Sequence, residues 1–92
     1  MRIMAIDYGD AHTGIAISDP TELLAGYTTV INAHRPEAVI QQIAQLAKEY
    51  GVEELVHGVV VSVDLLRQTF VELGLLVVSQ PVGQHTLTYQ IA

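Results

Sequence analysis

Two short apolar runs flank a glycine-framed loop near the start of the chain, and they constrain the fold more than any other feature. Residues 3–6 and 14–17 are rich in β-branched side chains and are bounded by Gly, Asp and Thr, which is typical of the two strands of a hairpin. Both faces of the first run are apolar, as in a strand that helices cover on both sides. The chain is therefore expected to build a sheet around this first strand.

A single carboxylate, Asp7, ends the first run. A charged side chain at that position is held by stiff backbone at the rim of a sheet, which suits a metal or phosphate site. Gly9 and Gly14 frame the loop that follows, and glycine permits positive φ angles and a close backbone approach to a ligand. The candidate site is therefore Asp7 together with this loop.

The rest of the chain alternates between strand and helix patterns. Residues 26–31 predict a third strand, which completes an antiparallel meander. Apolar side chains recur every three or four residues in the segment 36–50, which predicts an amphipathic helix. The nearly continuous apolar run 55–61 predicts a buried parallel strand after a right-handed crossover. A shorter helix over residues 65–73 and a fifth strand over residues 75–79 are expected to follow.

Length and composition bound the class of protein. One small domain over residues 1–92 is expected, because a chain of 92 residues buries only a modest core. Hydrophobic residues make up 50% of the chain, too many for a disordered protein, and the absence of cysteine excludes disulfides and thiolate metal ligands. Neither a secretory signal nor an apolar segment of membrane-spanning length is found, so a cytoplasmic protein without membrane contact is expected.

The acidic charge balance argues against an extended nucleic-acid surface. Ten acidic residues oppose four basic ones, which gives a formal charge of −6. Nucleic-acid-binding proteins usually carry a basic footprint, whereas the four cations of this chain are scattered along it. A local groove stays open as an interpretation, because a bound divalent cation can offset acidic residues beside a phosphate.

Residues 7–9 (Asp-Tyr-Gly) and 13–20 (Thr-Gly-Ile-Ala-Ile-Ser-Asp-Pro) together resemble the N-terminal signature of the YqgF family, also called RuvX. This family comprises small bacterial proteins of ribonuclease H-like fold, described as Holliday junction resolvases and as nucleases that mature small-subunit ribosomal RNA. The resemblance is good over residues 1–58 and poor beyond. Sugar kinases and actin-like ATPases of the same superfold share the D-x-G-x-x-x-x-G pattern, but residues 18–20 favour the YqgF family.

The resemblance implies an α/β fold of the ribonuclease H-like class. Its antiparallel three-strand meander is followed by βαβ-type parallel strands, in a mixed five-stranded sheet with helices packed on it. Nucleases of this fold use three or four carboxylates on divalent metals, one ion activating water and the other stabilising the leaving oxygen. By resemblance Asp7 is the first ligand and the catalytic residue, with Mg²⁺ or Mn²⁺ as the cofactor. Asp10 lies in the same loop and is either a further metal ligand or a solvated turn residue.

Four residues of the same loop are candidates for contact with phosphate or nucleic acid: Gly9, His12, Thr13 and Gly14. The two glycines and the threonine shape the loop by resemblance to the family. His12 stands where the family usually has Arg, so it either replaces a phosphate contact or is merely exposed. His57, inside an apolar run, is expected to be a hydrogen-bonded core or rim histidine rather than a ligand.

The second half of the chain departs from the family pattern. A glutamate expected after the fifth strand has no acidic counterpart in residues 79–85, and an aspartate on a late helix lies in a section that this chain lacks. The C-terminal part is therefore expected to be truncated or altered. Residues 86–91 alternate between polar and apolar as a strand does, whereas the family opens a helix there. Asp64 is either the cap of the second helix or the counterpart of a loop aspartate in the family.

Three classes of function follow from these observations. The first, to which we commit by family, is a metal-dependent nuclease for structured RNA or branched DNA; its second and third ligand carboxylates are not found in this chain, which leaves open whether it is catalytically complete or incomplete. The second is a non-catalytic fold remnant or a module that binds nucleic acid or protein. The third is a phosphate- or nucleotide-binding domain of the sugar kinase or actin-like type, which predicts a second, larger domain. A sheet without its final helix also exposes apolar surface and a free edge, so a homodimer is expected, through exchange of the C-terminal segment.

Overall fold

The computed structural model describes residues 2–19, 25–58, 63–75 and 86–91. The elements in chain order are β1 (Ile3–Asp7), β2 (His12–Ser18), β3 (Ala25–Asn32), α1 (Pro36–Tyr50), β4 (Glu54–Gly58), α2 (Val63–Glu72) and β5 (Thr86–Gln90). Among the described residues, no helix is both long and apolar enough to cross a membrane.

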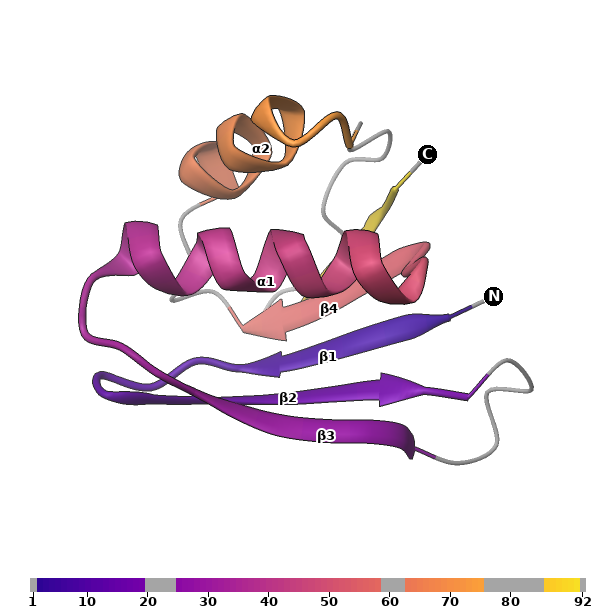
Figure 1. Cartoon of the computed structure of the whole chain (residues 1–92), viewed down its shortest axis with the longest axis horizontal. Helices are drawn as coiled ribbons and strands as arrows, with labels where there is room; N and C mark the ends of the chain where they lie inside the picture. Colours follow the sequence, from indigo (N-terminus) through magenta and orange to yellow (C-terminus); the bar gives the residue numbers. More distant parts are fainter. Residues whose placement is uncertain (1, 20–24, 59–62, 76–85, 92) are drawn as a thin grey trace.

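The strands form one mixed sheet in the order β3-β2-β1-β4-β5, with β1 at its centre (Figure 1). β1 pairs antiparallel with β2, and β2 pairs antiparallel with β3. β4 lies parallel to β1 on its other side, and α1 crosses over the sheet between β3 and β4. The predicted meander, the first long helix and the parallel strand after it are therefore confirmed.

The strand beside β4 is not the one that the sequence analysis expected. Leu75 lies outside any strand, and the remaining residues of the expected strand, 76–79, lie outside the described part of the chain. β5 occupies the position next to β4 and runs antiparallel to it, with Leu55 opposite Tyr89. The alternating pattern of residues 86–91, which the sequence analysis left open between strand and helix, therefore marks a strand.

Two boundaries also differ from the expectation. The described part of the buried strand ends at Gly58, and the rest of the expected run, 59–61, lies outside the described residues. α2 begins at Val63, so Asp64 lies inside its first turn and is not the residue that precedes the helix. A carboxylate in the first turn still interacts favourably with the positive end of the helix dipole, which explains why this residue type marks the start of α2.

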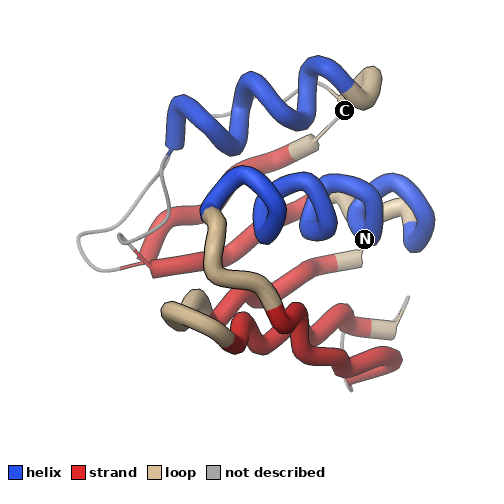
Figure 2. The backbone as a smooth tube through the Cα atoms, turned by 60° about the vertical axis from the view of Figure 1, so that its left-hand side comes forward, coloured by secondary structure: helices blue, strands red, loops and turns tan. Residues whose placement is uncertain are grey.

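Both helices cover the same face of the sheet (Figure 2). On β1 the side chains of Met4 and Ile6 are buried on that face, whereas Ala5 and Asp7 are exposed on the other. The expectation that helices cover both faces of β1 is therefore wrong for the described residues. The expectation failed because both faces of β1 carry apolar side chains, and Ala5 is small enough that its exposure costs little free energy.

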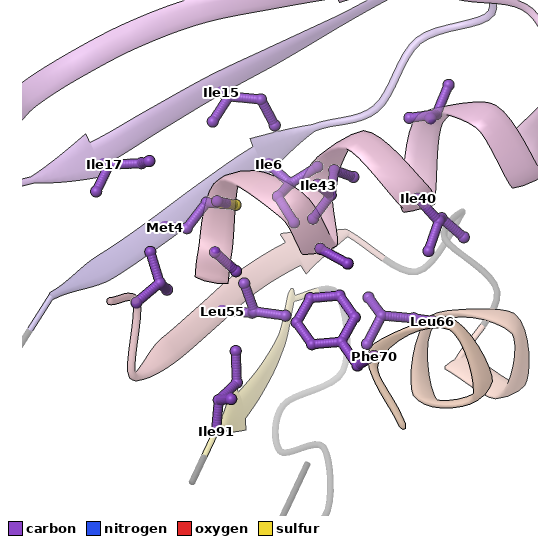
Figure 3. Close-up of a cluster of buried hydrophobic side chains, with 14 of the residues drawn as sticks. Met4, Ile6, Ile15, Ile17, Ile40, Ile43, Leu55, Leu66, Phe70 and Ile91 are labelled. Atoms are coloured by element: carbon purple, nitrogen blue, oxygen red, sulfur yellow. The ribbon is translucent and has the colours of Figure 1, made fainter. Parts of the chain in front are cut away.

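The core lies between this face and the two helices. Met4, Ile6, Ile15, Ile17 and Leu55 from the sheet meet Ile40 and Ile43 from α1 and Leu66 and Phe70 from α2 (Figure 3). The helix α1 begins at Pro36 and ends at Tyr50, and it is followed by Gly51, whose φ of 64° is left-handed. The amide of Val52 donates to the carbonyl of Ala47 at 2.9 Å, which closes the helix end in the manner of a Schellman motif.

Replacing Phe70 by alanine tests how strongly α2 is tied to the sheet. Phe70 is fully buried, whereas its neighbour Val71 is 60% exposed. We expect Phe70→Ala to lower the free energy of unfolding by about 3–5 kcal/mol, because a large side chain leaves a cavity. The control Val71→Ala is expected to change it by about 0.5 kcal/mol or less. Urea unfolding followed by circular dichroism measures both, and equal effects of the two variants would contradict the packing of α2.

Candidate functional site

Asp7 is the last residue of the central strand, and its side chain is exposed on the face that the helices leave open. Gly14 of β2 lies directly opposite it. A Cβ atom built on Gly14 would lie 3.7 Å from the Cβ of Asp7, an ordinary van der Waals contact. The absence of a side chain on Gly14 therefore leaves room beside the carboxylate.

A cavity of about 510 Å³ lies on the same open face and includes Asp7 in its lining. β1, β2, β3 and β4 all contribute to it, chiefly through small side chains such as Ala5, Ala16, Thr28 and Val56. Among the described residues of this lining, Asp7 is the one that carries an acidic group, and none of them is Lys or Arg. The site therefore offers a single carboxylate at the border of an uncharged, largely apolar depression.

The loop between β1 and β2 is held by contacts of its own. The amide of Gly9 donates to the hydroxyl oxygen of Thr13 at 3.5 Å. A Cβ atom on Gly9 would collide with the carbonyl oxygen of His12. Glycine at this position is therefore required by the close approach of two loop segments, which is a structural reason independent of any ligand.

Thr13 does not lie with Asp7. Its side chain is fully buried, and it alternates along β2 with Gly14, which faces the open side opposite Asp7. The expected membership of Thr13 in the phosphate loop stays a prediction, and its buried side chain is placed to shape the loop. Its hydroxyl group instead accepts the bond from Gly9 and fixes the loop from the core side.

His12 and Asp10 are both exposed. The Nδ1 atom of His12 lies 2.6 Å from Oδ1 of Asn32, to which it donates, so this ring is oriented by the neighbouring strand β3. His12 lies on the open face of the sheet together with Gly14, which is two residues further along β2. Asp10 lies in the loop itself, and no contact joins it to Asp7.

A complete metal site is not assembled by the described residues. No group of three or more His, Asp or Glu side chains among them is placed to hold a metal ion. Mg²⁺ is often bound by one or two carboxylates together with water and substrate phosphates, and Asp7 with the free space beside it fits that limited role. The residues do not fit the two-metal arrangement, which needs several convergent carboxylates.

His57 is a buried polar residue that also contributes to the lining of this cavity. It pairs with Ile6 on the core face of the sheet and is 2% exposed. Its Nδ1 atom donates to the carbonyl oxygen of Gly58 at 2.6 Å, and burial lowers the pKa of the imidazole below its ordinary value. The expectation of a hydrogen-bonded core or rim histidine is confirmed, and its signal was a lone polar residue within an apolar run.

The two glycines of the loop are expected to respond differently to alanine. Gly9→Ala should lower the free energy of unfolding by about 1–3 kcal/mol, because the new methyl group overlaps the carbonyl of His12. Gly14→Ala should cost about 1 kcal/mol or less, because its Cβ meets only an ordinary contact with Asp7. Chemical denaturation of the two variants measures the difference, and a larger cost at Gly14 would contradict this view of the loop.

The buried imidazole predicts a loss of stability in mild acid. Because the pKa of His57 is lowered in the folded state, the unfolded chain binds the proton first. The free energy of unfolding is therefore unaffected by the protonation of His57 above about pH 6.5, and it decreases progressively as the pH falls below that value. Urea unfolding between about pH 7.5 and 5.5 should show this slope, His57→Leu should flatten it, and the control His34→Asn at an exposed position should retain it. An unchanged slope in His57→Leu would contradict the assignment.

Comparison with known proteins supplies the family. The profile described as "RuvX: Holliday junction resolvase" matches residues 1–72, which cover β1 to α2. A protein of Chloroflexus aurantiacus named "Putative pre-16S rRNA nuclease" is 46% identical over 56 residues, covering 61% of this chain and 37% of that protein. Proteins of the same name from Dictyoglomus turgidum and Pelotomaculum thermopropionicum are 39% identical over 62 residues and 41% identical over 59 residues.

Each match covers only part of this chain and only part of the relative. The last two relatives cover 67% and 63% of this chain, and the aligned region is 44% and 38% of their own length. The chain therefore spans less than half the length of these curated relatives. No solved structure matches the chain. Since the family profile covers most of the chain and includes Asp7 and the loop beside it, the chain belongs to the RuvX (YqgF) family of Holliday junction resolvases, whose fold is ribonuclease H-like.

Proposed function

We propose that this chain acts as a metal-dependent nuclease on structured RNA, with branched DNA as the alternative substrate. The observation that carries the proposal is the position of Asp7. Its carboxylate is exposed at the end of the central strand, beside a cavity of about 510 Å³, within the region that the family profile matches. The names of the relatives favour ribosomal precursor RNA, and the family description favours DNA junctions. The proposal places the chain in the cytoplasm, where bacterial ribosomal RNA is matured.

In this proposal Asp7 supplies one oxygen ligand for Mg²⁺ or Mn²⁺, both of which prefer hard oxygen donors. A bound cation would neutralise phosphate charge and acidify water for attack on the phosphodiester bond. The chain itself orients the carboxylate and leaves room for the substrate. The backbone of β1 fixes the carboxylate, and Gly14 leaves the space beside it free for a sugar–phosphate segment.

The further ligands are not provided by the described residues close to Asp7. Asp10 is a candidate from the neighbouring loop, and phosphate oxygens and water would complete the shell of a single cation. His12 is exposed on the same side and would meet the nucleic-acid backbone as a hydrogen-bond donor. The proposal therefore assigns one cation to Asp7 and no two-metal mechanism.

A second candidate is a binding module without catalysis. It is favoured by the lack of a three-ligand cluster in the described part of the chain and by the formal charge of −6. A protein that lost its remaining ligands would retain the sheet and the loop, but neither cation binding nor cleavage would depend on Asp7. The two candidates therefore differ in whether cation binding and cleavage depend on Asp7.

Asp7→Asn separates the candidates. The change keeps the size of the side chain but weakens its interaction with a cation, so Mn²⁺ binding by calorimetry should be lost. Mn²⁺-dependent cleavage of a structured precursor RNA should fall by about 100-fold or more. Glu37→Gln removes a carboxylate from the exposed first turn of α1 and is the matched control, expected to leave both properties unchanged. Asp10→Asn reports whether a second ligand comes from the loop.

Each outcome of this experiment supports a different candidate function. Cation binding that is indifferent to Asp7, or the absence of cleavage of both structured RNA and branched DNA, would favour the binding module. Cleavage of branched DNA alone would retain the nuclease but change its substrate. Circular dichroism of each variant shows that the fold is intact before activity is compared.

A further inference from the structure

Within the described part of the chain, the outer edge of β3 is open over residues 27–32. β3 is the first strand in the sheet order, so β2 is its one neighbour among the strands that the structure describes, and it borders the sheet in Figure 1. Its eight residues, Ala-Gly-Tyr-Thr-Thr-Val-Ile-Asn, include no charged residue and no proline. Natural edge strands usually carry lysine, proline or a bulge, or are very short, because an open edge is a template for another strand. β3 has one such irregularity, a register shift at Gly26, and residues 27–32 pair regularly with β2.

The hydrogen-bond pattern identifies which backbone groups face outwards. The amide of Ala33 donates to the carbonyl of Ala11 at 3.1 Å, so this pair is of the hydrogen-bonded kind. The register between Tyr27 and Asn32 is regular, and hydrogen-bonded pairs alternate with non-bonded pairs along an antiparallel ladder. The backbone groups of Thr28, Val30 and Asn32 therefore point away from β2.

Side chains beside this edge also favour a strand as the partner. Val30 is 53% exposed on the open face of the sheet. On the helix side a groove of about 260 Å³ runs between β3 and α1, and its lining includes Gln42, Gln45 and Glu49. This groove contains one acidic group and no basic one, so it would repel nucleic-acid phosphates.

We propose that two copies of this chain associate through antiparallel pairing of their β3 edges. The occupant is a second copy because β3 is complementary to itself about a two-fold axis. Placing Thr29 opposite the partner's Thr29 sets Tyr27 opposite the partner's Ile31 and Thr28 opposite the partner's Val30. Thr–Thr is a favourable cross-strand combination. Ile31 is buried in the core of its own copy and Tyr27 stacks on Tyr50, so the pairing depends on Thr28, Thr29 and Val30. In this register the outward backbone groups of Thr28 and Val30 bond to each other across the axis.

The charge of the protein gives the association a distinctive dependence on salt. Each copy carries a formal charge of −6, so two copies repel each other and added salt weakens that repulsion. The β3 dimer should therefore become tighter as the salt concentration rises. Binding to nucleic acid would become weaker under the same conditions.

A charged residue at the exposed edge tests the proposal. Val30→Lys places an ammonium group at the pairing surface of both copies and should raise the dissociation constant of the dimer by about tenfold or more. Val71→Lys is the matched control, because Val71 is exposed to a similar extent on α2 and the charge change is the same. Sedimentation equilibrium over a range of protein and salt concentrations measures the constants, and circular dichroism verifies the fold of each variant.

Hydrogen exchange provides a second readout that a change in stability alone would not produce. On raising the protein concentration, the amides of Thr28 and Val30 should gain protection, whereas those of Thr29 and Ile31 already bond to β2 and should change little. A wild-type protein that stays monomeric at every concentration, even if it binds an added peptide, would overturn the proposal. A dimer that Val30→Lys does not weaken would also overturn it and would indicate exchange of the C-terminal segment. Neither result depends on the nuclease assay.

Discussion

The packing of one face of β1 against the helices is the constraint on which the rest of the structure depends. β1 is the central strand and bonds to β2 on one side and to β4 on the other. Met4 and Ile6 are buried beneath α1 and α2. Because side chains of a strand alternate, the burial of Ile6 places Asp7 on the opposite face. The exposure of the carboxylate is thus a consequence of the core, and a one-residue slip of β1 would bury it.

The glycines around Asp7 serve two different physical purposes. Gly9 is needed because the loop passes too close to the carbonyl of His12 for any side chain, so it shapes the turn. Gly14 meets no such obstacle, and its missing side chain creates free space beside Asp7. A motif that reads as one phosphate-binding pattern in the sequence therefore divides into a structural glycine and a glycine that opens the site. Thr13, buried on the core face, belongs to the structural part.

Both described helices cover the same face of the sheet, and the opposite face connects the Asp7 site with the β3 edge. The open face carries the Asp7 cavity, and the same face continues to the exposed Val30 on β3. The family match covers β1 to α2, which includes the site. Beyond the matched residues, β5 completes the sheet and runs antiparallel to β4.

Local sequence patterns determined the hairpin, the helix α1, the parallel strand after it and the place of Asp7 at a strand end, because each depends on periodicity and turn residues close in the chain. Only the tertiary structure decided which face of β1 is covered and which segment lies beside β4. Both depend on contacts between residues far apart in sequence, such as Leu55 with Phe70 or with Tyr89. The same holds for Thr13, because its burial on the core face follows from the packing of β2. Periodicity identifies an amphipathic element, but the partner that covers it is fixed by the packing of the whole chain.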